Sequence, residues 1–187
     1  MKRWFIFLSI LILFGCGNED EYNGGIRNTD IIILSEEQIS NFVNVLPSIL
    51  EFSEKYNETL SKAERESPDA NKKFFETLKK SKKMQRIAKE NNFNSIDELI
   101  VVYKNVVLSY MSIKVEFTNF NESITHIQTI IQSNEMKLSN DFKENKITKK
   151  DFEEKLEGLK IDKIRVQNII TTKKFEKQID EISQKYN

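Results

Sequence analysis

The chain has 187 residues, and its 29 lysines and arginines balance its 29 aspartates and glutamates, so the formal net charge is zero. This balance argues against general nucleic-acid binding, which requires a basic surface. Only five glycines and two prolines are present, and no glycine lies between Ile26 and Glu157. Because sheets with tight hairpins need glycine or proline turns, the sequence predicts an all-α fold.

The amino terminus has the pattern of an export signal. Lys2 and Arg3 precede an apolar run, residues 4–14, which is followed by Gly15 and by Cys16, the only cysteine. As a helix this run would measure about 16 Å, too short to cross a hydrocarbon core of ~30 Å. Residues 1–15 are therefore predicted to be a signal peptide.

The last residues of this segment, Leu13-Phe14-Gly15-Cys16, resemble the lipobox of bacterial lipoproteins. The resemblance is confined to this amino-terminal region, and it implies cleavage between Gly15 and Cys16, a diacylglyceryl thioether on Cys16 and an acylated amino terminus, typically palmitate. The protein would then be anchored by lipid in the bacterial cell envelope. The outer membrane or the cell surface is favoured because glycine, not aspartate, follows the cysteine. A plain secretory signal and an uncleaved anchor are the alternatives.

Residues 16–34 are predicted to form the lipidated cysteine and a flexible tether, and residues 35–187 a single helical domain. The stretch from Gly17 to Asp30 is polar, and a flexible chain of this length has a mean reach of about 20 Å and an upper limit of about 50 Å. The apolar run at 31–34 is expected to pack on the helices, with a short strand as the alternative.

Four helices are predicted, at about 36–66, 68–91, 96–145 and 149–186. Ser35 and Gln38 have the spacing of a capping box at the first helix, and Pro47 should kink or split that helix. Ser67 and Pro68 are expected to start the second helix.

The second helix is also the most basic stretch of the chain. Its basic stripe is a candidate patch for an anionic partner, such as lipid head groups near the membrane; the alternative is an ordinary solvated face. The stripe consists of Lys72, Lys79, Lys83 and Arg86.

The third helix carries the strongest periodic pattern. From Leu99 to Ile131, apolar residues recur at alternating steps of four and three, which is typical of a heptad seam. The fourth helix begins at Thr148, which has the spacing of a capping box with Asp151, and a change of apolar phase predicts a rotation or break near residues 171–172.

Folded back on each other, the third and fourth helices would form a long two-helix coiled-coil hairpin with its tip near Lys146. Gly158 would face Glu135, where its missing side chain would permit close approach. The first two helices would pack on the first half of the third helix and the end of the fourth. The predicted architecture is an elongated antiparallel helical bundle.

Residues that commonly carry chemistry are scarce. His126 is the only histidine, and there is neither a metal-binding spacing nor a glycine-rich phosphate loop. We therefore predict no enzyme activity, no cofactor and no metal site. By elimination, the predicted function is a binding or scaffolding module for an unknown protein partner. A periplasmic chaperone or assembly factor that uses the hairpin is the alternative, and the heptad seam also permits a homo-oligomer.

Overall fold

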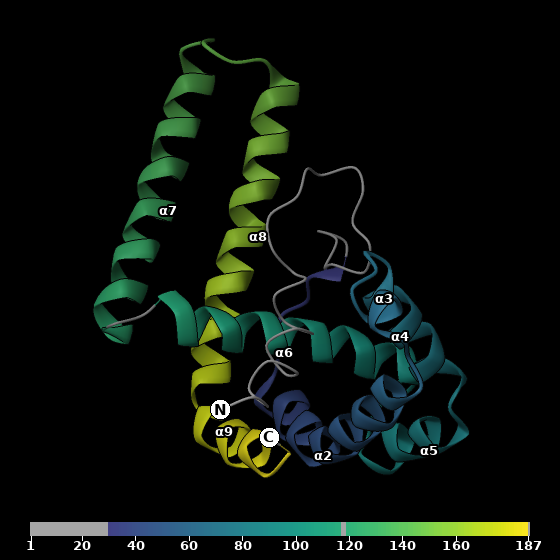
Figure 1. Ribbon diagram of the computed structural model, residues 1–187. Coiled ribbons are helices and arrows are strands. Elements are labelled where there is room, and N and C mark those ends of the chain that lie inside the picture. Colours follow the sequence, from purple (N-terminus) through teal and green to yellow (C-terminus); the bar gives the residue numbers. More distant parts are fainter. Residues whose placement is uncertain (1–29, 117–118, 187) are drawn as a thin grey trace.

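The computed structural model describes residues 30–116 and 119–186. The predicted signal peptide, Cys16 and most of the predicted tether lie outside these residues. The described part of the chain is α-helical, as predicted, and has no strand (Figure 1). Its helices are α2 (Glu36–Glu58), α3 (Lys62–Arg65), α4 (Ala70–Lys80), α5 (Lys82–Glu90), α6 (Ile96–Glu116), α7 (Phe120–Lys143), α8 (Lys149–Lys173) and α9 (Glu176–Lys185).

Local sequence determines several helix ends. The Ser35 hydroxyl accepts a hydrogen bond from the Gln38 amide at 3.1 Å, and the Gln38 side chain accepts one from the Ser35 amide at 3.0 Å, which confirms the predicted capping box. Thr148 and Asp151 form the same motif at the start of α8. Pro47 lies inside α2 and does not split it.

The first two helices are shorter than predicted. The helix predicted at 36–66 ends at Glu58 and is followed by the short α3. The helix predicted at 68–91 begins only at Ala70, and it is interrupted by Ser81, whose backbone is extended and whose hydroxyl accepts a hydrogen bond from the Met84 amide. Ser67 does not cap α4 as expected, because its hydroxyl donates to the carboxylate of Asp69.

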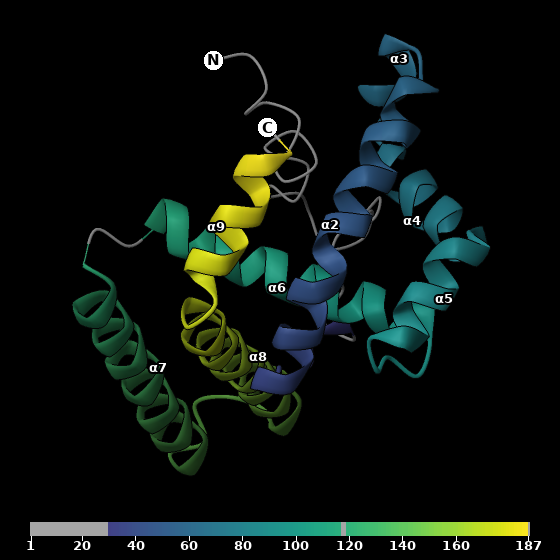
Figure 2. The same cartoon turned by 90° about the horizontal axis from the view of Figure 1, so that it is seen from below.

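The prediction of one continuous third helix at 96–145 is wrong, because two helices cover this range. α6 ends at Glu116, and α7 begins at Phe120 after an extended Asn119. Figure 2 shows that α7 then runs in a different direction from α6. The heptad pattern does not reveal this break, because the apolar spacing continues across it. Ile113 before the break and Ile124 after it are both buried.

The larger hydrophobic core joins α2, α4, α5, α6 and α9. This agrees with the prediction that the first two helices pack on the first half of the third helix and the end of the fourth. Edge-to-face aromatic contacts link three of these helices: the Phe74 ring lies 5.9 Å from Phe52, 5.6 Å from Tyr56 and 5.3 Å from Phe75 between ring centroids. The Phe75 ring in turn lies 5.6 Å from that of Tyr103 on α6. These aromatic side chains fix the position of α4 between α2 and α6.

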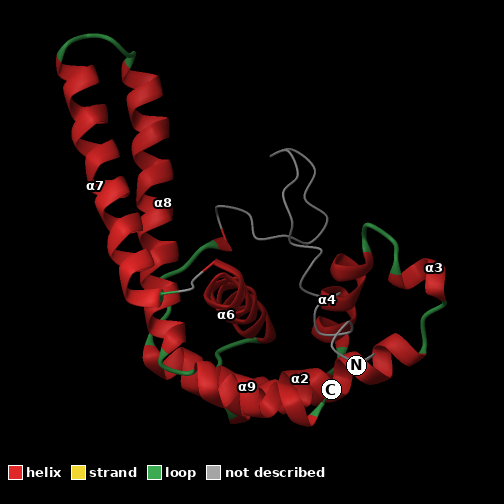
Figure 3. Ribbon diagram, turned by 60° about the vertical axis from the view of Figure 1, so that its left-hand side comes forward, coloured by secondary structure: helices red, strands yellow, loops and turns green. Residues whose placement is uncertain are grey.

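The hairpin of α7 and α8 extends from this body (Figure 3). Its helices are antiparallel and share a second, smaller core that includes Ile131 and Val166. Near the tip, the rings of Phe142 and Phe152 stack with centroids 4.4 Å apart. Coiled-coil supercoiling of the hairpin stays a prediction.

Gly158 does not serve the role predicted for it. It is exposed, and a Cβ atom built on it would meet no atom within 4 Å. The helices therefore do not approach closely at this glycine, and the space beside it is open.

The predicted interruption of the last helix is present, at Lys174 and Phe175, between α8 and α9. Charged side chains connect α9 to α6: Lys114 Nζ lies 2.7 Å from Glu176 Oε1 and 2.8 Å from Asp180 Oδ2. Burial alone would lower the pKa of Lys114, but the hydrogen bonds to these two carboxylates raise it.

Tyr110 extends this charged cluster into the core. Its hydroxyl donates a hydrogen bond to Asp180 Oδ1. Burial, together with this bond, raises the pKa of the Tyr110 hydroxyl well above its ordinary value. The tyrosine therefore stays protonated and joins α6 to α9.

Candidate functional site

The segment 30–34 is held on the body by two buried asparagines. Asn105 of α6 donates from Nδ2 to the Asp30 carbonyl at 2.9 Å, and its Oδ1 accepts from the Ile32 amide at 3.4 Å. Asn168 of α8 donates to the Ile32 carbonyl at 2.7 Å and accepts from the Leu34 amide at 2.8 Å. The two side-chain amides bind one edge of the extended segment much as the peptide groups of a neighbouring strand would.

An ion pair strengthens this attachment. Lys104 Nζ lies 3.5 Å from the Asp30 carboxylate, and both side chains are largely buried. Leu34 is buried in the main core. The apolar run at 31–34 packs on the helices, as expected. Residues 30–34 therefore belong to the body, and the tether predicted at 16–34 can only precede them. No strand forms there either, because the partners are side chains.

An apolar groove of about 590 Å³ begins at this segment. Ile31 lines it together with side chains from α6, α7 and α8. Alternate residues of an extended segment point to opposite sides, and Ile32 and Leu34 pack on the core. Ile33, on the same side as Ile31, is 65% exposed. The apolar lining includes Ile31, Leu108, Ile127, Ile130, Leu159 and Val166.

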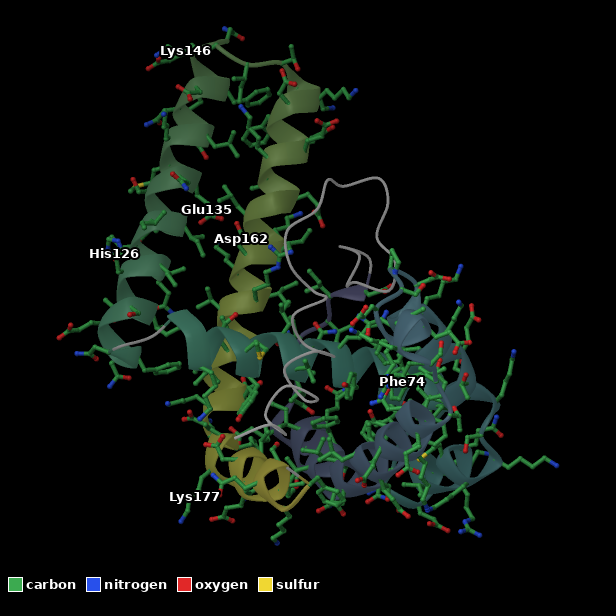
Figure 4. All side chains as sticks on the ribbon, viewed as in Figure 1. Phe74, His126, Glu135, Lys146, Asp162 and Lys177 are labelled. Atoms are coloured by element: carbon green, nitrogen blue, oxygen red, sulfur yellow. The ribbon has the colours of Figure 1, made fainter. Side chains whose placement is uncertain are left out.

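The groove continues toward the hairpin tip, where its lining includes more charged side chains. A second hollow of about 380 Å³ shares Asn134, Leu159 and Asp162 with the first and extends past Gly158. Figure 4 shows Asp162 on the side of α8 that faces α7. The lining of this distal part is largely charged, with Lys137, Asp141 and Lys155 beside Asp162. An apolar ligand therefore fits the half of the groove near the base of the hairpin.

The basic stripe predicted on the second helix is divided between two helices. The break at Ser81 places Lys72 and Lys79 on α4, and Lys83 and Arg86 on α5. Lys79 pairs with Asp97, Lys83 lies 3.2 Å from Glu51, and Arg86 lies 3.4 Å from Glu90. Three of the four cations are thus compensated by carboxylates, which favours the alternative of an ordinary solvated face.

The histidine singled out in the sequence lies on the outer side of the hairpin. His126 is exposed and points away from α8 (Figure 4). Within 30–116 and 119–186, no group of three or more histidine, cysteine or acidic side chains is placed to hold a metal ion. Over the same stretch, no helix has the length and apolar character needed to cross a membrane. The chemistry that this surface supports best is the burial of an apolar group.

The sequence predicted neither the groove nor the asparagine clamp, the pair Asn105 and Asn168 that holds residues 30–34. Asn105 was the available clue, because it lies within an apolar stretch of its helix. A polar side chain in such a position must find a partner, yet the sequence does not say which backbone it binds. Comparisons of the chain with protein-family models, with curated proteins and with solved structures found no match.

Proposed function

We propose that the protein is a lipoprotein of the bacterial cell envelope, anchored through a lipid on Cys16, with a helical body that acts as a binding module. The lipobox-like Leu13-Phe14-Gly15-Cys16 supports the anchor, and the place where the chain from Cys16 enters the body supports the binding module. Asp30 is held by Lys104 and Asn105, and Ile31 lines the apolar groove. A tether of thirteen residues, with a mean reach of about 20 Å, would keep this groove near the membrane.

Fractionation of the cells that make the protein tests the anchor. The wild-type chain should sediment with membranes, and the Cys16→Ser variant should be released into the soluble fraction, because a thioether lipid can no longer form. A soluble wild-type chain would indicate a plain secretory signal. A variant that stays in the membrane fraction would indicate an uncleaved anchor. Either result contradicts the proposal.

We place the body at the outer membrane or cell surface, where it would meet a protein partner. Protease added to intact cells should remove the body if it faces outward, while a cytoplasmic protein in the same cells stays intact as the control. Complete protection of the body would contradict a surface location.

A chaperone or assembly role through the hairpin is a second candidate, supported by the apolar side chains that it exposes. Met136 is 58% exposed and Phe142 is 37% exposed, both on α7. The Cys16→Ser chain should then suppress aggregation of an unfolded client, and Met136→Glu should weaken that suppression. A chain that gives no protection at molar excess would remove this candidate.

A further inference from the structure

The apolar groove lies beside the point where the chain from Cys16 joins the body. We propose that the groove holds one acyl chain of the lipid on Cys16, so that the body docks at the membrane surface instead of hanging free on its tether. This inference rests on the proposed function, because it requires the lipid. It adds a ligand class and a site to that function.

The length of the connecting chain makes this arrangement accessible. Thirteen residues lie between Cys16 and the body at Asp30, which corresponds to a mean reach of about 20 Å and an extended limit of about 45 Å. The body end of this connection is Ile31, itself part of the groove wall. The acyl chain would therefore reach the groove as an intramolecular ligand, at an effective concentration of order mM.

The size and chemistry of the groove suit an acyl chain. Its volume of about 590 Å³ falls within the range of small-molecule sites. The amides of Asn105 and Asn168, which also line it, are already engaged by the backbone of residues 30–34. The Ser109 and Ser112 hydroxyls on the same wall donate to backbone carbonyls of α6. The charged pair on the wall, Arg165 and Asp162, is joined at 3.3 Å. These groups therefore require no hydrogen-bonding partner from an occupant. The charged distal half limits an apolar occupant to the base.

Moving an acyl chain from the bilayer into the groove costs little hydrophobic free energy. An acyl chain that leaves the bilayer for the groove moves from one apolar environment to another, and it covers apolar side chains that otherwise face water. Ile130, on the groove wall, is 44% exposed without such a cover. The remaining acyl chains on Cys16 would stay in the bilayer and keep the protein on the membrane.

Photocrosslinking in the full-length protein tests the proposal. Ile130 is replaced by the photoreactive amino acid benzoylphenylalanine, and the protein is irradiated in its native membrane before mass spectrometry of the adducts. The matched control carries the same replacement at Met136, which is exposed on the same helix and is absent from the groove lining. We expect an intramolecular adduct with the Cys16 acyl chain, at a yield about tenfold higher from position 130 than from 136.

Hydrogen exchange supplies a second measurement that needs no bulky replacement. The amides of residues 127–131 should exchange more slowly in the lipidated wild-type protein than in the Cys16→Ser variant, because the acyl chain covers them. Equal adduct yields, adducts with bulk phospholipid or a protein at position 130, or unchanged exchange would overturn the groove proposal while the lipoprotein assignment stands. A native chain without lipid on Cys16 would instead contradict the proposed function itself.

Discussion

Replacing Asn168 with alanine removes both hydrogen bonds by which α8 holds residues 32 and 34. The Asn168 side chain is only 2% exposed, so water cannot readily take over its role. The loss of two hydrogen bonds costs about 1 kcal/mol each, and a buried amide left without an acceptor adds about 1–3 kcal/mol. Alanine is the better helix former by roughly half a kcal/mol. We expect Asn168→Ala to lower the free energy of unfolding by about 2.5–4.5 kcal/mol.

Urea unfolding of the chain from Gly17 onward, followed by circular dichroism, measures this change. The matched control is Asn140→Ala, an exposed asparagine on α7, which should change stability by no more than about 0.5 kcal/mol. Native-state hydrogen exchange locates the effect: the Leu34 amide should lose protection in Asn168→Ala and keep it in Asn140→Ala. If the two variants unfold at the same urea concentration with equal protection of Leu34, the side-chain clamp does not hold the segment.

Three further predictions concern the helices and the core. Gly158→Ala should raise the free energy of unfolding by about 0.5–1 kcal/mol, since alanine favours helix and its Cβ meets open space; a loss in urea unfolding would mean that the helices do approach closely there. Burial raises the pKa values of Tyr103 and Tyr110 above 10.0, so their contribution to stability is complete below about pH 10 and is lost as the pH rises through the folded-state values. Stability should therefore fall above that pH, and it should fall less steeply in Tyr103→Phe. A thermal melting temperature that stays constant above that pH would contradict the burial of both hydroxyls. Phe74→Ala should cost about 3–5 kcal/mol in urea unfolding, because three ring contacts and a buried volume are lost, whereas a cost below about 1 kcal/mol would refute the aromatic link between α2 and α4.

Features that depend on neighbouring residues were predictable from the sequence. The capping boxes at Ser35 and Thr148 were found because their partners lie three residues away. The buried face of the third predicted helix followed from its spacing, and Leu99 and Ile131 are buried as expected. The scarcity of glycine and proline indicated the all-α fold.

Features that depend on distant residues were not predictable in the same way. Periodicity reports which face is buried and is insensitive to a turn that keeps the apolar phase, so the break before Phe120 was missed. The clamp joins Asn168 to Leu34, 134 residues apart, and no local pattern encodes that contact. Gly158 was misjudged because a glycine permits close approach without requiring it.

The intact mass of the protein extracted from its native membranes tests the central claim most directly. The proposed function predicts a chain that begins at Cys16 and carries a diacylglyceryl group on its sulfur, with a further acyl group on the new amino terminus. A chain that retains residues 1–15, or one whose Cys16 thiol is free, would contradict the lipid anchor and the function built on it.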